Sequence, residues 1–195
     1  MPRPAHLPYA GGGTSRVRVE GMGLPWVLPI AGASVRPWQA EDLPSLVAHA
    51  NNRNVAHQLR DRFPHPYEPE HGRGFLSWLA RQETPTVWAI AVEGRAVGGI
   101  GLELGQDVER VSAEIGYWLG ERFWGRGIAT AALDAVTARA FALFDLSRIF
   151  AVPFAGNAAS IRVLEKAGYV REGHLRHSAV KDGVILDQYL YARYR

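Results

Sequence analysis

The chain has 195 residues, of which 47% are hydrophobic and 21% are charged, a composition that suits one domain with a sizeable core. It has no cysteine, which excludes disulfides, thiolate metal sites and any mechanism that carries an acyl group on an enzyme thiol. The seven histidines show no metal-ligand spacing, so no catalytic metal is expected. The formal net charge is +3 with scattered cations, almost all of them arginines, so no direct nucleic-acid binding is expected. This mild basicity is compatible with an anionic ligand or an RNA-associated partner, but the base composition of the genome explains the arginines better.

The N-terminal segment differs in composition from the rest of the chain. Residues 1–20 are rich in proline and glycine and are expected to be a flexible leader, with a single domain over 21–195. Arginines before the apolar stretch Met22–Ile30 imitate a signal peptide, but two prolines interrupt that stretch. Nowhere does an apolar run reach the roughly 20 residues of a membrane span. We therefore expect a cytoplasmic protein without membrane contact.

The first half of the domain alternates between helix and strand patterns. A strand is expected over 33–38, followed by a helix that Glu41 and Asp42 open and that runs to Ala50. The segment 57–72 contains three prolines among aromatic residues and is expected to be an ordered loop of the kind that binds or covers something. Next come a helix over 75–82 and strands over 86–92, 96–104 and 112–119, the first two of these strands joined by a hairpin-like turn.

The sequence Arg-Phe-Trp-Gly-Arg-Gly, from Arg122 to Gly127, lies between a predicted strand and a long predicted helix. Gly125 and Gly127 allow a tight bend that brings backbone N–H groups close to an anion. The helix start adds further N–H groups and the positive end of the helix dipole, while Arg122 and Arg126 add charge. The loop therefore indicates a phosphate or pyrophosphate site, although Gly-x-Gly also occurs at ordinary strand-to-helix turns.

The second half of the domain begins with that long helix. Apolar residues recur every four positions from Ile128 to Phe144 and predict one buried helix face. A strand is expected over 147–152 and a helix over 157–167, ended by a glycine. The last strands, over 169–175 and 184–191, are joined through an Asp-Gly hairpin signal. The pattern as a whole predicts an α/β (α+β) fold, a mixed sheet with helices on its faces.

Three motifs together carry a resemblance to a known family. They are the strand Ala113-Glu114-Ile115-Gly116-Tyr117-Trp118-Leu119, the loop Arg122-x-x-Gly125-x-Gly127, and Asn157-x-x-Ser160 followed by Glu165-Lys166-Ala167-Gly168-Tyr169. Because these motifs occur in this order, residues 33–195 resemble a GNAT-fold N-acetyltransferase. The resemblance is greatest to the Rim-type group, which acetylates ribosomal-protein N-termini. The resemblance implies a central, mixed, mostly antiparallel, twisted sheet of about seven strands, with helices on both faces and a V-shaped split.

The resemblance also implies the cosubstrate acetyl-CoA, bound between the strands predicted over 112–119 and 147–152. Backbone groups near Trp118 and Leu119 would pair with the pantetheine and the thioester, and N–H groups from Arg122 to Thr130 would hold the pyrophosphate. The residues expected to bind acetyl-CoA are Tyr117, Trp118, Leu119, Arg122, Gly125, Arg126, Gly127, Ile128, Ala129, Thr130, Asn157 and Ser160.

The catalytic residues that the resemblance implies are Asn157, Ser160 and Glu114. Asn157 would contact the cofactor arm, and it also suits the N-cap of its helix, so we expect both roles. Ser160 would donate a proton to the leaving thiolate. Glu114 is the candidate base, acting directly or through a water, unless it is a structural carboxylate. Some relatives carry another acid that is missing here, so His174, His177 or water are the alternatives, although either histidine could be merely packed or solvated.

The resemblance implies direct attack of a neutral amine on the thioester in a ternary complex, and the missing cysteines favour it over transfer through an enzyme thiol. An α-amino group, with a pKa near 8, is neutral at pH 7 far more often than a lysine with a pKa near 10.4, so a peptide N-terminus is the easier acceptor. A ribosomal-protein N-terminus and a small-molecule amine both remain candidate acceptors, with the loop from Phe63 to Tyr67 as a wall of the acceptor site. The protein is expected to be a monomer or a homodimer.

Two other functions compete with this interpretation. A nucleotide-dependent oxidoreductase would use Gly125-x-Gly127 and Asp145, which lies 20 residues beyond Gly125. However, Thr130 stands in place of the third glycine, and Asp145 falls at the end of a helix instead of a second strand. The other alternative is a non-catalytic module that binds acetyl-CoA. The intact motifs favour an active enzyme over that module.

Overall fold

The computed structural model describes residues 27–30 and 32–195, so the leader predicted over 1–20 lies outside the described residues. The strands are β1 (Leu28–Ile30), β2 (Ala33–Arg36), β3 (Val87–Val92), β4 (Arg95–Leu104), β5 (Ser112–Leu119), β6 (Arg148–Ala151), β7 (Val170–Lys181) and β8 (Val184–Tyr194). The α-helices are α1 (Leu43–Ala50), α2 (Arg53–Ala56), α3 (Pro69–Leu79), α4 (Ile128–Leu143) and α5 (Ala158–Lys166).

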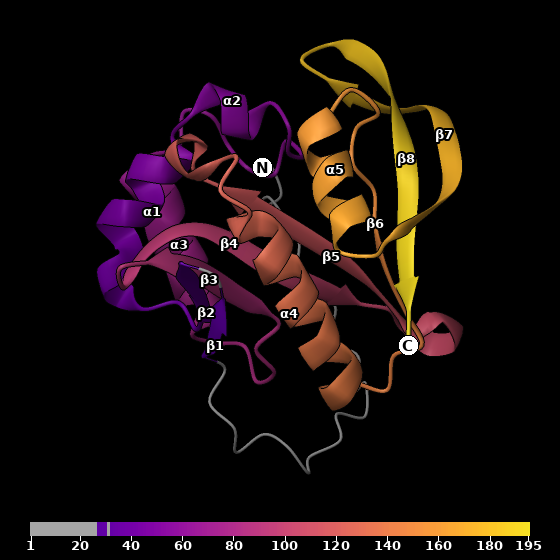
Figure 1. Cartoon of the computed structure of the whole chain (residues 1–195). Helices are drawn as coiled ribbons and strands as arrows, with labels where there is room; N and C mark the ends of the chain where they lie inside the picture. The colour runs from indigo at the N-terminus through magenta and orange to yellow at the C-terminus, as the bar shows by residue number, and fades with distance from the viewer. Residues whose placement is uncertain (1–26, 31) are drawn as a thin grey trace.

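The described strands form one sheet of eight strands in the order β1-β2-β3-β4-β5-β6-β8-β7 (Figure 1). Strands β5 and β6 run parallel, and the other neighbours in this sheet run antiparallel. The long helix α4 connects β5 to β6, which makes these two strands and the helix a βαβ unit. The predicted mixed, mostly antiparallel sheet is therefore confirmed, with one strand more than the seven expected segments.

Several predicted boundaries were wrong. The loop expected over 57–72 ends early, because α3 begins at Pro69 and not near residue 75. Proline lacks the N–H that the first turn of a helix leaves unpaired, so at this position it starts the helix. The structure also contains β1 and α2, which the sequence did not predict, and β7 continues six residues beyond 175, to Lys181. In α2, the side chain of Asn52 accepts hydrogen bonds from two backbone N–H groups and so caps a four-residue helix.

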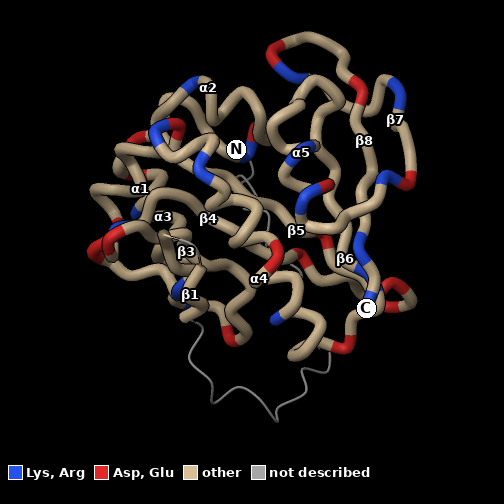
Figure 2. Tube along the Cα trace, viewed as in Figure 1, with Lys and Arg blue, Asp and Glu red and all other residues tan. Residues whose placement is uncertain are grey.

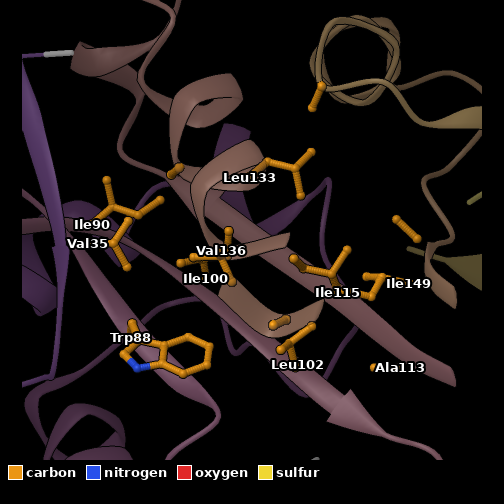
Figure 3. Close-up of a cluster of buried hydrophobic side chains, with 14 of the residues drawn as sticks. Val35, Trp88, Ile90, Ile100, Leu102, Ala113, Ile115, Leu133, Val136 and Ile149 are labelled. Carbon is orange, nitrogen blue, oxygen red and sulfur yellow. The ribbon is translucent and has the colours of Figure 1, made fainter. Parts of the chain in front are cut away.

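One face of the sheet packs against α4. The predicted four-residue recurrence is confirmed, since Ile128, Ala132, Val136 and Ala140 are all buried. Figure 3 shows side chains of this helix among buried residues of the strands. The cluster that these residues form includes Val35, Trp88, Ile90, Ile100, Leu102, Ile115, Leu133, Val136 and Ile149.

A second hydrophobic cluster lies on the opposite face of the sheet. Leu46 and Ala50 of α1 pack there with Tyr67, and Trp118 of β5 packs against them. Successive side chains of a strand point to opposite faces, so Ile115 faces α4 while Trp118 faces α1. Strand β5 therefore contributes side chains to both layers of helices.

Charged residues of both signs are interspersed along the described chain, as Figure 2 shows. No helix in residues 27–30 and 32–195 combines the length and the apolar character needed to cross a membrane.

Candidate active site

The sheet opens between the two parallel strands. Strand β5 pairs with β6 only over Ser112–Glu114, opposite Arg148–Phe150. Beyond that point β5 continues to Leu119 while pairing with β4, and β6 ends at Ala151 before Pro153. The two strands therefore separate into a V-shaped split, with one side of β5 unpaired by β6.

The hydrogen-bond register decides which backbone groups face this split. The N–H of Gly120 donates to the carbonyl of Val97 at 2.7 Å, so alternate residues back along β5, including Trp118, bond to β4. Tyr117 and Leu119 direct their backbone groups to the other side, toward the split. The indole Nε1 of Trp124 donates to the Leu119 carbonyl at 2.7 Å, which leaves the groups of Tyr117 and the Leu119 N–H facing the opening.

A cavity of about 820 Å³ passes through the split and reaches both faces of the sheet. Eleven of the predicted site residues line it: Glu114, Tyr117, Trp118, Leu119, Gly125, Gly127, Ile128, Ala129, Thr130, Asn157 and Ser160. Arg122 and Arg126 are exposed and do not line it. The guanidinium of Arg126 lies 5.2 Å from the ring centre of Phe123. Arg122 acts on His49, whose pKa is lowered first by burial and then by the positive charge of Arg122.

The loop before α4 has the shape of an anion cradle. Gly125 and Gly127 have φ values of 74° and 77°, a left-handed conformation that side chains disfavour. A Cβ atom at either position would meet no protein atom within 4 Å, so the space beside the backbone is open. The first helical hydrogen bond runs from Ala131 N to Gly127 O at 3.0 Å. The N–H groups of Ile128–Thr130 therefore have no carbonyl partner within the helix and can bind an anion.

Asn157 and Ser160 lie at the start of α5, across the split from β5. The predicted N-cap is confirmed, because Asn157 Oδ1 accepts a hydrogen bond from Ser160 N at 3.0 Å. The hydroxyl groups of Ser160 and Tyr117 are 2.8 Å apart, and Tyr117 also donates to the Ser160 carbonyl at 3.2 Å. Burial raises the pKa of Tyr117, so its phenol stays protonated. The sequence predicted both residues at the site but not the contact between them.

Glu114 lines the cavity on the opposite face of β5 from Tyr117. Its carboxylate forms an ion pair with the guanidinium of Arg60, which belongs to the segment after α2. Arg60 also lines the cavity, yet sequence reasoning missed it, since one arginine among many in a proline-rich loop gives no signal. Two residues farther along β5, Gly116 lines the same face.

Comparison with known proteins decides the family. The acetyltransferase (GNAT) domain family matches residues 34–170. The chain belongs to this family. It is 35% identical over 100 residues to the putative ribosomal N-acetyltransferase YdaF of Bacillus subtilis. The matched segment covers 51% of this chain and 54% of YdaF. It thus spans about half the length of the curated relatives it matches.

Solved structures support the GNAT fold. Mycobacterium smegmatis RimJ in complex with CoA-disulfide has a TM-score of 0.73 at 26% identity, covering 86% of this chain and 85% of that one. RimL, a ribosomal L7/L12 α-N-protein acetyltransferase in complex with coenzyme A, has a TM-score of 0.76 at 21% identity and covers 86% and 97% of the two chains. The latter similarity shows the fold alone. The predicted resemblance to the GNAT superfamily and its Rim-type group is confirmed.

His174 and His177, the alternative candidates for the base, lie in the β7–β8 hairpin of this GNAT domain and do not line the cavity. His174 Nε2 lies 2.6 Å from Asp187 Oδ2, and the backbone N–H of His177 donates to Asp187 Oδ1 at 2.8 Å. These two hydrogen bonds, the backbone one foremost, lower the pKa of Asp187. The structure therefore brings Glu114 to the cavity and leaves both histidines outside its lining.

The tip of the same hairpin reaches the segment that carries Arg60. Lys181 is buried and its Nζ donates to Asp61 Oδ1 at 2.8 Å. The neighbouring Asp182 Oδ2 lies 3.0 Å from His57 Nδ1. We call these two contacts the strap, because they tie the hairpin to residues 57–61 beside the cavity. In the part of the GNAT domain that the structure describes, no group of three or more His, Cys, Asp or Glu side chains could hold a metal ion.

Proposed function

We propose that this GNAT domain transfers the acetyl group of acetyl-CoA to a primary amine by direct attack in a ternary complex. The observation that carries the proposal is the cavity that passes through the split sheet. It presents anion-binding N–H groups at the start of α4 on one side and the carboxylate of Glu114 on the other. Two substrates can therefore meet from opposite faces.

Acetyl-CoA fits the α4 side of the cavity. The N–H groups of Ile128–Thr130 bind its pyrophosphate, and Gly125 and Gly127 keep the approach clear of side chains. Tyr117 and Leu119 offer backbone groups to the pantetheine arm, as a neighbouring strand would. The structure of the similar protein RimJ was solved in complex with CoA-disulfide, which supports this ligand. Bound acetyl-CoA supplies the thioester.

Ser160 assists the leaving group. Its hydroxyl donates a proton to the thiolate as the carbon–sulfur bond breaks, and Tyr117 holds the hydroxyl in place at 2.8 Å. A thiol with an ordinary pKa near 8.5 leaves readily, so the assistance is modest. Asn157 fixes the start of α5 through its cap. Its amide nitrogen would contact the cofactor arm.

Glu114 accepts the proton that the amine loses as the new carbon–nitrogen bond forms, either directly or through a water. Arg60 keeps this carboxylate oriented along the face of β5. The acceptor lies between Glu114 and the wall that Phe63 and Tyr67 provide. The relative YdaF is named a putative ribosomal N-acetyltransferase, which supports a ribosomal-protein amine as one acceptor. A small-molecule amine is the other candidate acceptor.

The oxidoreductase alternative loses its support in the structure. Asp145 lies before β6 instead of at the end of that strand, and its carboxylate is 3.6 Å from a guanidinium nitrogen of Arg195. A dinucleotide-binding fold would place such an acid at the end of the second strand, where it bonds the ribose.

The test combines binding and turnover. Fluorescence of the six tryptophans, titrated with acetyl-CoA and with NAD, reports binding, and a thiol-release assay over peptides and small amines reports transfer. We expect acetyl-CoA to bind and NAD not to bind. We also expect thiol release only when an amine is present. Binding without release on any amine would favour a non-catalytic module, and absence of acetyl-CoA binding would overturn the proposal.

A further inference from the structure

Gly116 leaves a gap in the floor of the acceptor side. It lies within β5 in ordinary extended backbone, where any residue can stand, and a Cβ atom there would meet nothing within 4 Å. Glycine weakens the interior of a strand, and it often marks a close approach by a ligand. Its neighbours on the same face, Glu114 and Trp118, carry large side chains. The protein itself therefore does not fill the space above Gly116.

Aromatic rings line the same cavity as Gly116. The ring centres of Phe63 and Trp118 are 5.4 Å apart in an edge-to-face contact, and those of Phe63 and Tyr67 are 5.2 Å apart. Phe75 and Trp78 of α3 also line the cavity, with ring centres 6.2 Å apart. Rings in mutual contact hold one another in place and present a rigid apolar surface.

Charged side chains also line this part of the cavity, among them Glu114 and Arg60. Glu114, paired with Arg60, stands two residues from Gly116, which is roughly 6.6 Å along a strand. The far edge of a phenylalanine ring lies about this distance from the amino nitrogen of the same residue. The strap between Lys181 and Asp61 holds the segment that carries Arg60 next to the cavity. An amino group near Glu114 would therefore place its neighbouring substituent over Gly116.

We propose that the acceptor is a primary amine whose amino-bearing carbon carries a large apolar substituent. An aromatic substituent suits the site best. This inference rests on the proposed acetyl transfer and names its substrate class. The substituent lies over Gly116 and packs against Phe63, Tyr67 and Trp118, while the amino group faces Glu114. The same chemistry occurs in the first residue of a peptide and in a free arylalkylamine.

A matched panel of acceptors tests the class with the unmodified protein. The peptides Phe-Gly-Gly, Leu-Gly-Gly, Ser-Gly-Gly and Asp-Gly-Gly differ only in the first side chain, and 2-phenylethylamine and ethylamine supply the free-amine pair. We expect kcat/KM for Phe-Gly-Gly to exceed that for Ser-Gly-Gly by about tenfold or more, as burial of a large apolar group implies. The better of Phe-Gly-Gly and 2-phenylethylamine identifies the source.

The outcomes separate this inference from the proposed function. Turnover with equal or reversed preference for the polar side chains would overturn the substrate class and leave acetyl transfer intact. No turnover with any amine, despite acetyl-CoA binding, would overturn acetyl transfer and the substrate class with it.

A second measurement fills the gap above Gly116. Gly116→Val adds a side chain that the strand tolerates, and Gly74→Val is the matched control in α3, exposed and outside the cavity lining. We expect Gly116→Val to lower kcat/KM for Phe-Gly-Gly at least tenfold, to affect ethylamine less, and to leave acetyl-CoA affinity within about twofold. The control should match the unmodified protein. Unchanged use of Phe-Gly-Gly by a Gly116→Val protein that binds acetyl-CoA would contradict the proposal.

Discussion

The two sides of the split in the sheet are assembled in different ways. The α4 side comes from one continuous stretch of chain, since β5, the glycine loop and the start of α4 follow one another in residues 112–130. The acceptor side combines Glu114 of β5 with Arg60, and the strap adds Lys181 from the far end of the chain. The proposed anion cradle is therefore encoded locally, whereas the proposed acceptor side depends on contacts between distant segments.

The largest expected effect is on the α4 side of the split, which neighbouring residues of the chain form. Gly127→Ala forces an alanine into the left-handed conformation and puts a methyl group into the anion cradle. We expect the Kd for acetyl-CoA to rise by about 100-fold, from strain and from the displaced phosphate. Tryptophan fluorescence titration measures this change.

A matched control separates strain from binding. Gly94 has a φ of 78° in the β3–β4 hairpin, and a Cβ atom there also meets nothing within 4 Å. Gly94→Ala should cost a similar free energy of unfolding, about 1 kcal/mol, without changing acetyl-CoA affinity. Equal affinity losses in the two variants would show that the cradle does not bind the cofactor.

The next effect separates the two sides by kinetics. Glu114→Gln removes the proposed base from the acceptor side while keeping its size. We expect kcat to fall by about 100-fold with the Kd for acetyl-CoA unchanged, because a positioned base contributes on this scale. Steady-state kinetics and fluorescence titration together check the result. A kcat within twofold of the unmodified protein would show that Glu114 is a structural carboxylate and that water removes the proton.

A smaller effect concerns the contact that spans the split. Ser160→Ala should lower kcat by about fivefold, because a thiolate needs little help to leave. Tyr117→Phe should lower kcat by a similar factor, since it removes the hydroxyl 2.8 Å from Ser160. The double variant should be no slower than Ser160→Ala, as residues acting through one hydrogen bond are not additive. If the double variant instead loses the product of the two single losses in kcat, the two hydroxyl groups act independently.

The smallest effect is on the strap. The hydrogen bond from His57, followed by the charges around it, lowers the pKa of Asp182 from its ordinary 3.8. A carboxyl whose folded pKa is lowered stabilises the fold above its unfolded pKa, and the stabilisation is lost as the pH falls through the folded value. Asp182→Asn should therefore lower the melting temperature slightly at pH 7 and not at pH values well below 3.8. A difference that persists in acid would exclude this ion pair as its cause.

Differences between prediction and structure follow the same division. The α4 face, the glycine loop and the cap at Asn157 were predicted, because each depends on neighbouring residues in the chain. The start of α3 was missed because prolines were interpreted as loop signals, although Pro69 occupies the first position of the helix, where proline is favoured. The extension of β7 was missed because its irregular register at 175–179 hides the alternation of a strand.

The sequence by itself determined the order of most of the elements, the family resemblance and the shape of the proposed anion cradle, since periodicity, glycine conformation and helix starts act over a few residues. Only the tertiary structure decided where β5 and β6 separate, which backbone groups of β5 face the split, and which partners Glu114, Ser160 and Lys181 meet. These features depend on strand register and on side chains brought together from segments far apart in the chain, and no local pattern of residues specifies them.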